Sequence, residues 1–281
     1  MAKKKKTPLI FSSLRAFFGA LSKVSPKLAL EFAFHLFFRP RGRLKQVVMP
    51  DVETSLFYID VNGKRVSVQS WGSGPLVILV HGWEGRGMQW HKFIPALASA
   101  GYRAVTFDAP AHGASTGKST NLLEFSATIR AIRDVLGEPY AVVGHSMGGA
   151  AMGIAFDEGL SGKKAVAISA PAKLDFAIEQ FSKMINLSGS VRNRMRDRIS
   201  KHLKRAVETL NFDGISERLT MPALIIHDKY DRIVPVENGY SIHRAWNGSR
   251  LAETSGLGHV RILEDDSVIQ KVVSFIDTEP V

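Results

Sequence analysis

The chain has 281 residues, of which 45% are hydrophobic and 22% are charged, and its mean hydropathy is close to zero. This is an ordinary soluble composition, sufficient for one domain with a large core or for one domain with an insert. Cysteine is absent, which excludes a disulfide framework and a thiolate metal site and agrees with a reducing compartment. We therefore expect a cytoplasmic protein.

The formal net charge of +11 is unevenly distributed. Residues 1–45 contain eleven Lys and Arg residues and one acid, Glu31, so this segment carries +10 and the rest of the chain about +1. The segment also holds apolar residues at the spacing of one helix face: Ile10, Leu14, Phe17, Phe18 and Leu21. A short amphipathic helix is predicted here. A signal peptide fits poorly, because Arg15 interrupts its apolar core.

A second helix is expected from Ser25, as N-cap, to the residues before Pro40. Its apolar span, residues 28–38, is too short and too polar to cross a bilayer. Two alternatives remain for residues 1–45. The apolar helix faces pack on the rest of the protein, which we favour for the second helix, or they contact an anionic membrane surface at the inner face of the membrane.

The remaining chain alternates strand and helix signals. Residues 55–61 and 64–71 flank Asn62-Gly63, a dipeptide typical of a tight antiparallel hairpin. Five nearly all-apolar runs follow, separated for the most part by helical patterns such as 88–100 and 121–136, and they predict strands buried on both faces: "PLVILVHG", "AVTFDAP", "YAVVGHS", "KAVAISAP" and "PALIIHD". The predicted fold is α/β, with a mostly parallel central sheet, an N-terminal antiparallel hairpin and helices on both faces.

The domain organisation expected from these patterns is a basic helical extension over residues 1–50 and an α/β domain over 51–281. Residues 173–220 are too many for one crossover helix and predict a helical lid insert. The stretch "VRNRMRDRISKHLKR" inside this insert has seven basic residues and one acid. Its basic residues alternate with apolar ones and no aromatic or groove-reading pattern accompanies them, so a solvated helix is favoured and no nucleic-acid partner is expected.

The stretch "YAVVGHSMGGAA" places Ser146 between glycines at the point where a predicted strand ends and a helix begins. A G-x-S-x-G sequence in this context predicts a sharp, strained turn that exposes the serine oxygen at the carboxyl end of the strand. The motif alone is weak, and its context gives it weight. Ser146 is therefore the candidate nucleophile.

A serine nucleophile requires a histidine that takes its proton and an acid that orients the histidine. Asp231 lies in "HDKYDRIVP", after a predicted buried strand, and His259 lies in "GLGH", near the C-terminus. The order Ser146, Asp231, His259 is the order expected for a serine on a strand–turn–helix of this kind. Asp228 competes with Asp231 for the role of the acid. For the oxyanion, the backbone N–H groups of Trp83 and Met147 are the expected donors.

These motifs resemble the α/β-hydrolase superfamily, in the group with small helical lids that includes carboxylesterases and monoacylglycerol-lipase-like enzymes. The resemblance covers about residue 55 to the C-terminus, excluding the insert, and rests on five motifs: "HGWEG", "FDAPAHGAS", "GHSMGG", "HDKYDRIVP" and "GLGH". Because a serine occupies the turn, dehalogenase and epoxide hydrolase chemistry, which use a carboxylate nucleophile in similar families, are disfavoured.

The expected function is hydrolysis of a carboxylic ester through an acyl-enzyme on Ser146, with a small-molecule or lipid-like ester as substrate. No cofactor and no metal site are expected, since the nine histidines show no ligand spacing. A thioesterase, an amidase or a perhydrolase with the same triad remains an alternative. So does a peripheral membrane-binding protein whose hydrolase domain is vestigial.

Overall fold

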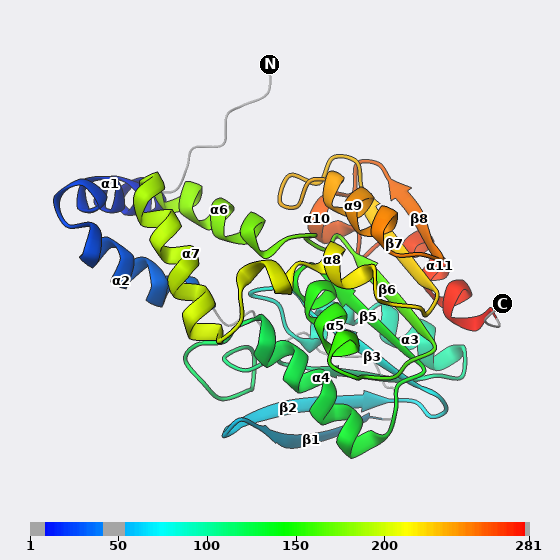
Figure 1. Cartoon of the computed structure of the whole chain (residues 1–281). Coiled ribbons are helices and arrows are strands. Elements are labelled where there is room, and N and C mark those ends of the chain that lie inside the picture. Colours follow the sequence, from blue (N-terminus) through cyan, green and yellow to red (C-terminus); the bar gives the residue numbers. More distant parts are fainter. Residues whose placement is uncertain (1–8, 42–53, 279–281) are drawn as a thin grey trace. The chain divides into compact units, whose positions relative to one another are not determined.

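The structure, a computed structural model, describes residues 9–41 and 54–278, and it divides them into two compact units (Figure 1). One unit comprises the described residues up to Phe38 together with Lys173–Leu210. The other comprises the described residues of Arg39–Ala172 and Asn211–Val281. The lysines at positions 3–6 and the end of the expected extension, residues 42–50, lie outside the described residues.

The larger unit is built on an eight-stranded sheet with the order β1-β2-β4-β3-β5-β6-β7-β8. β1 pairs with β2, and β2 with β4, in antiparallel orientation, whereas all later neighbours are parallel. Asn62 and Gly63 have positive φ values of 53° and 74°, as the predicted hairpin turn requires. The strands are Thr54–Val61, Lys64–Trp71, Leu76–Val80, Arg103–Phe107, Ala141–His145, Lys164–Ile168, Ala223–Asp228 and Ser249–Thr254.

Helices cover both faces of this sheet, as predicted (Figure 1). On one face lie α3 (Phe93–Ser99) and α11 (Asp266–Asp277). On the other lie α4 (Leu122–Leu136), α5 (Met147–Asp157), α8 (Phe212–Ser216) and α9 (Glu237–Ala245). Two short segments, η1 (Gly87–Trp90) and α10 (Gly258–Arg261), complete the described helices of this unit.

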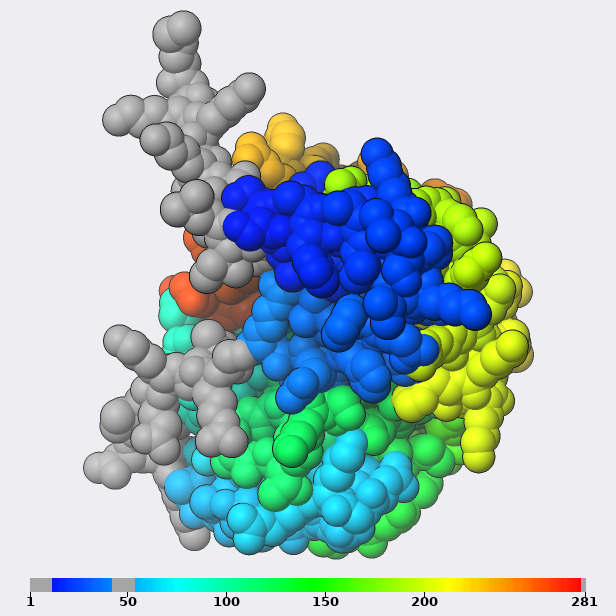
Figure 2. Space-filling view, turned by 90° about the vertical axis from the view of Figure 1, so that its left-hand side faces the viewer, coloured from blue at the N-terminus to red at the C-terminus, as the bar shows by residue number. Residues whose placement is uncertain are grey.

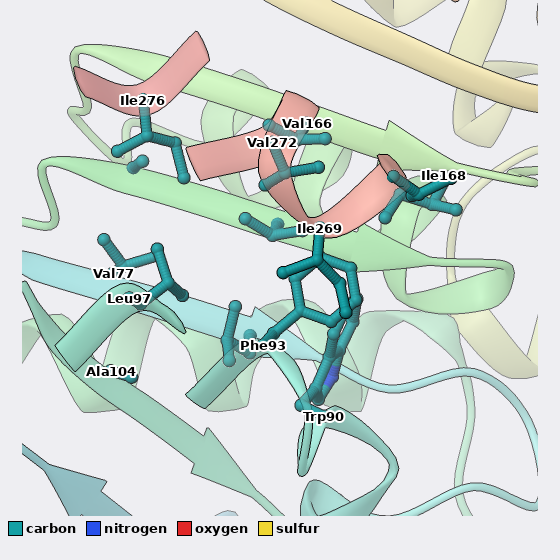
Figure 3. Packing of buried hydrophobic residues seen from close by; sticks show 14 of the residues in the cluster. Val77, Trp90, Phe93, Leu97, Ala104, Val166, Ile168, Ile269, Val272 and Ile276 are labelled. Carbon is teal, nitrogen blue, oxygen red and sulfur yellow. The ribbon is translucent and has the colours of Figure 1, made fainter. Parts of the chain in front are cut away.

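The core under α3 and α11 shows why these segments fold as they do (Figure 3). Alternate strand residues point to one face, so Val77, Val166 and Ile168 meet the apolar side of the two helices. The helix residues Phe93, Leu97, Ile269, Val272 and Ile276 recur at helical spacing and are almost fully buried. Burial of each such side chain contributes about 1.5–3 kcal/mol.

Two segments differ from the sequence-based expectation. The helical pattern over residues 88–100 is a 3-10 turn followed by α3, which begins at Phe93. Pro95 lies in the first turn of α3, the part of a helix where a residue without an N–H is tolerated. Strand β8 was not predicted, because it lies at the edge of the sheet and its residues are exposed or half-buried without a regular alternation.

The smaller unit contains α1 (Leu9–Val24) and α2 (Pro26–Phe37) together with α6 (Leu174–Ile185), α7 (Gly189–Leu203) and η2 (Val207–Leu210). The expected insert over about 173–220 thus corresponds to Lys173–Leu210, and α8 belongs to the larger unit. Every helix within the described residues is too short or not apolar enough to cross a lipid bilayer.

Two residues of the basic run on α7, Arg196 and Arg198, form ion pairs inside this smaller unit. Arg196 donates hydrogen bonds to Asp175 and Glu208, and Arg198 donates to Glu31 of α2, with an Nη2···Oε2 distance of 2.8 Å. The guanidinium of Arg198 also lies over the ring of Phe34. These contacts hold α2 against α7 and leave less positive charge on α7 than its sequence alone indicates.

Candidate active site

Ser146 occupies the single residue between β5 and α5. Its φ of 52° and ψ of −125° form the strained turn that the G-x-S-x-G motif predicts. A Cβ on Gly144 would lie 2.6 Å from the carbonyl oxygen of Gly148, and one on Gly148 would lie 2.4 Å from that of Val80. The two glycines are therefore required by close approach of backbone, and the turn presents Ser146 at the carboxyl edge of the parallel strands.

The loops after β7 and β8 leave the same edge of the sheet and carry the other two predicted residues. Nε2 of His259 lies 3.1 Å from Oγ of Ser146, and Nδ1 of His259 lies 2.7 Å from Oδ2 of Asp231. The three side chains form one hydrogen-bonded series. Because the ionised carboxylate of Asp231 only accepts, Nδ1 of the histidine carries the proton and Nε2 accepts from the serine hydroxyl.

The turn after β3 lies directly beside Ser146. A Cβ built on Gly82 would be 3.0 Å from the Cβ of Ser146, which places the backbone of residues 82–83 against the serine. Met147 begins α5, whose N-terminal N–H groups have no partners within the helix. The amides of Trp83 and Met147 thus belong to the two segments that meet at Ser146, and both residues are half-buried.

A comparison with known protein families shows to which family the chain belongs. A family model described as "Alpha/beta hydrolase family" matches residues 77–270, which is more than half of the chain. The chain belongs to the alpha/beta hydrolase family. This membership confirms the resemblance and the fold class expected from the sequence, and it supports a hydrolase activity.

Individual relatives agree with this assignment. The chain is 27% identical over 260 residues to a 2-hydroxy-6-oxononadienedioate/2-hydroxy-6-oxononatrienedioate hydrolase of Pseudomonas sp., a match that covers 76% of this chain and 89% of that protein. It is 38% identical over 86 residues to a pimeloyl-(acyl-carrier protein) methyl ester esterase of Aeromonas hydrophila, covering 30% of this chain and 33% of the esterase. A non-heme chloroperoxidase of Kitasatospora aureofaciens is 32% identical over 92 residues, covering 31% of this chain. The matched region covers 33% of the length of the chloroperoxidase, the same share as for the esterase.

Solved structures share the fold. A bromoperoxidase from Bacillus anthracis superimposes with a TM-score of 0.64 at 23% identity, covering 79% of this chain and 99% of the bromoperoxidase. An esterase from Exiguobacterium antarcticum superimposes with a TM-score of 0.63 at 20% identity, again covering 79% and 99%. At these identities the likeness establishes the alpha/beta hydrolase fold.

Asp231, the candidate acid of this alpha/beta hydrolase site, is held by its own loop. Burial by itself raises the pKa of Asp231, but the hydrogen bond and charge of His259 and the amides of Val234 and Ile233 outweigh it, and the net shift is downward. Those two amides donate to Oδ1 at 3.0 and 2.8 Å, which leaves Oδ2 for His259. The carboxylate is therefore ionised at neutral pH and fixed in direction.

Asp228, the competing candidate, has a different place in the alpha/beta hydrolase site. Its buried carboxylate accepts from the hydroxyl of Thr254 at 2.8 Å, the amide of Leu257 at 2.9 Å and the amide of Tyr230 at 2.9 Å. These bonds connect the loop that carries Asp231 with the loop that carries His259. Asp228 thus joins the two loops.

The Asp228→Asn substitution is expected to lower the free energy of unfolding by about 2–4 kcal/mol at neutral pH, because an amide NH2 would replace one acceptor oxygen among buried donors. Burial raises the pKa of Asp228, but the donors from Leu257, Thr254 and Tyr230 outweigh it and lower the pKa overall. The carboxylate therefore stabilises the fold above the unfolded-state pKa of about 3.9, and this contribution is lost as the pH falls through the lower folded-state pKa.

Urea unfolding of the parent and of the Asp228→Asn variant at neutral pH and in acid measures this effect. The difference in unfolding free energy should be largest at neutral pH and shrink in acid. Asp266→Asn is the matched control, since the Asp266 side chain is 90% exposed and its replacement should change stability by less than about 0.5 kcal/mol. Equal midpoints for the parent and Asp228→Asn at neutral pH would refute the role of Asp228.

Two buried histidines support the turn that carries Trp83. The amide of Ala109 donates to Nε2 of His81 at 2.9 Å, so Nδ1 of His81 carries the proton and donates to the carbonyl of Gly82 at 2.7 Å. The amide of Glu84 donates to Nε2 of His112 at 3.1 Å. Burial lowers the pKa of both imidazoles, that of His81 to well below its ordinary value. Both rings are therefore neutral and act as fixed hydrogen-bonding groups.

His145 makes a contact that the sequence did not indicate. Its Nε2 lies 2.9 Å from the backbone carbonyl of His259 and therefore donates to it, while Nδ1 lies 3.3 Å from the side-chain nitrogen of Gln89. Burial, followed by the charge of His259, lowers the pKa of His145 to about 3, so the ring is neutral. Through these two contacts His145, the residue before Ser146, holds the backbone of the loop that carries His259. Gln89 carries no motif signal in the sequence.

The described part of the chain contains no group of three or more His, Asp or Glu side chains arranged to hold a metal ion. The polar groups gathered around Ser146 are instead one hydroxyl, one imidazole, one carboxylate and backbone amides. Such a set is suited to nucleophilic attack on an electrophilic carbon.

Proposed function

We propose that this alpha/beta hydrolase cleaves carboxylic esters through an acyl-enzyme formed on Ser146. The observation that carries the proposal is the hydrogen-bonded series from Oγ of Ser146 through His259 to Asp231, with distances of 3.1 and 2.7 Å. A serine hydroxyl is a weak nucleophile unless a base removes its proton as it attacks. His259 has the position and the tautomer for that role, and Asp231 has the position to orient it.

In the acylation step, Oγ of Ser146 attacks the ester carbonyl carbon while its proton passes to Nε2 of His259. Asp231 stabilises the imidazolium that forms. Negative charge develops on the former carbonyl oxygen, and the N–H groups of Trp83 and Met147 are its proposed donors. Collapse of the tetrahedral intermediate breaks the ester C–O bond, and His259 returns the proton to the leaving alkoxide.

In the deacylation step, a water molecule occupies the position of the departed alcohol. His259 removes its proton as the water attacks the acyl carbon, and the second tetrahedral intermediate releases the carboxylic acid and regenerates the hydroxyl of Ser146. The sequence of steps requires no redox change.

One observation favours ester chemistry over the thioesterase and amidase alternatives, and a second disfavours epoxide hydrolysis. The Aeromonas hydrophila relative is a methyl ester esterase. The epoxide hydrolase B of Mycobacterium tuberculosis is 39% identical over 80 residues, but a serine stands at the nucleophile turn here, and serine forms an acyl-enzyme from an ester directly.

The test is hydrolysis of p-nitrophenyl esters from acetate to palmitate, followed in the pre-steady state. We expect a burst of p-nitrophenol close to one equivalent per enzyme with at least one acyl length, because acyl-enzymes accumulate when deacylation is slow. After acid quench, mass spectrometry should find the acyl group on the peptide that contains Ser146.

Matched thioester and anilide substrates with the same acyl group separate the alternatives. Faster turnover of the thioester or anilide would assign the triad to thioesterase or amidase chemistry. Absence of turnover and of acylation with all three substrate classes would overturn the proposal.

A further inference from the structure

The outward faces of α1 and α2 carry four large apolar side chains exposed to solvent. Their exposed fractions are 51% for Phe17, 85% for Val24, 51% for Leu28 and 53% for Phe32. Phe17 and Val24 are seven residues apart on α1, and Leu28 and Phe32 are four apart on α2, so each pair lies on one helix face. These four residues are named the α1/α2 apolar patch.

The patch is continuous across the two helices. The rings of Phe17 and Phe32 are in contact, with centroids 6.4 Å apart, and Figure 2 shows the helices side by side at the surface. The opposite faces are already used, because Phe18 and Phe34 are buried and Phe34 stacks edge-on against His202 of α7. The patch is therefore not needed for packing within the smaller unit, and exposed apolar clusters of this kind mark interaction surfaces.

Positive charge adjoins the patch. Lys23 and Lys27 are exposed and adjoin Val24 and Leu28 in the sequence. The single acid of residues 1–45, Glu31, forms an ion pair with Arg198. In the sequence, four consecutive lysines at positions 3–6 stand a few residues before α1. Among the described residues, Lys23 and Lys27 thus place positive charge beside the patch.

The exposed apolar side chains and the neighbouring lysines together indicate which partner fits the patch. Anionic lipid headgroups attract lysines, while Phe and Leu side chains insert at the boundary between headgroups and acyl chains. A second copy of the chain would bring the same lysines against each other, and their repulsion would oppose association. An anionic bilayer satisfies both the apolar and the charged parts of the surface.

We propose that the α1/α2 apolar patch docks onto an anionic phospholipid bilayer, with Phe17, Val24, Leu28 and Phe32 in the interfacial region and the neighbouring lysines among the headgroups. The docking is peripheral and goes beyond the proposed ester hydrolysis. It gives the N-terminal extension a role of its own, since the buried faces of α1 and α2 pack with the inserted helices and the outward faces contact lipid.

The experiment is sedimentation of the full chain with vesicles of two parts phosphatidylcholine to one part phosphatidylglycerol, at low and high salt. We expect binding at low salt, weaker binding at high salt and much weaker binding to pure phosphatidylcholine. The double substitution Phe17→Ser with Phe32→Ser should lower the partition coefficient at least about tenfold, since each buried ring contributes more than this factor. Lys23→Glu with Lys27→Glu should reduce binding to anionic vesicles specifically.

Leu56→Ser with Val135→Ser is the matched control, because both residues are exposed but lie on β1 and α4. This control should bind as the parent does, and all variants should hydrolyse a soluble ester at the parent rate. The proposal is overturned if the parent stays in the supernatant at low salt. Unchanged vesicle binding of the double Phe variant would also overturn the proposal, because attachment would then depend on charge alone. The proposal would likewise be overturned if the parent did not bind vesicles but formed a dimer that the Phe substitutions dissociate.

Discussion

Replacing Ser146 with Ala is expected to lower kcat/KM for p-nitrophenyl esters by about 10⁵-fold. In the proposed mechanism the substitution removes the atom that forms the acyl-enzyme, so only binding and the backbone donors remain to stabilise the transition state. The turn itself should survive, because Ala keeps the Cβ of Ser146 and the flanking glycines remain in close contact with backbone. Steady-state kinetics at equal folded concentration, verified by circular dichroism, measure the loss.

Ser169→Ala is the matched control for this prediction. Ser169 follows β6 as Ser146 follows β5, it has a similar positive φ of 49°, and its buried hydroxyl has no hydrogen-bond partner among the described residues. We expect this variant to retain activity within about threefold of the parent, a change of under 1 kcal/mol in the barrier. If both serine variants lost activity equally, or if Ser146→Ala kept it, Ser146 would not be the nucleophile.

Replacing Asp231 with Asn is expected to lower kcat by about 10⁴-fold. The Asn oxygen can still accept from the amides of Ile233 and Val234, which keeps the loop folded, but an NH2 group then faces Nδ1 of His259. To accept a hydrogen bond from that NH2 group at Nδ1, the imidazole must carry its proton on Nε2. Nε2 can then no longer accept the proton of Ser146. Single-turnover kinetics with p-nitrophenyl butyrate measure the acylation rate directly.

Comparison of Asp231→Asn with Asp228→Asn separates catalysis from folding. Of the two variants, Asp231→Asn should show the larger loss of kcat, and Asp228→Asn should show the larger loss of unfolding free energy. The reverse outcome would make Asp228 the acid of the triad and would contradict the contact of 2.7 Å between His259 and Asp231.

The fold could be predicted for those elements whose burial requires a recognisable run of apolar residues. Strands such as β5 and β7 are buried at every position, so their residues form unbroken apolar runs. β8 lies at the sheet edge, and "SRLAET" mixes charged and apolar residues that give no such run. The break before α3 depends on tertiary packing of Trp90 and Phe93, whose rings contact each other, and a helical period does not reveal it.

The candidate site was predictable where chemistry requires a residue type in a motif. Ser146, Asp231 and His259 stand in three motifs, and the structure brings them into hydrogen-bonding distance. The contact between His145 and the backbone of His259 joins residues 114 positions apart through a carbonyl group, which has no sequence signature. Gln89 was not predictable for the same reason.

The smaller unit also has a consequence for synthesis on the ribosome. Glu31 and Arg198, which join α2 to α7, are 167 residues apart in the sequence. At roughly 5–20 residues per second, α1 and α2 emerge about ten to thirty seconds before the helices that cover their buried faces. During that interval the nascent chain displays phenylalanine-rich surfaces on both sides of these helices. We therefore expect the yield of folded protein to rise when chaperones that bind exposed apolar segments are co-expressed, because such chaperones would shield the N-terminal helices until residue 210 has been made.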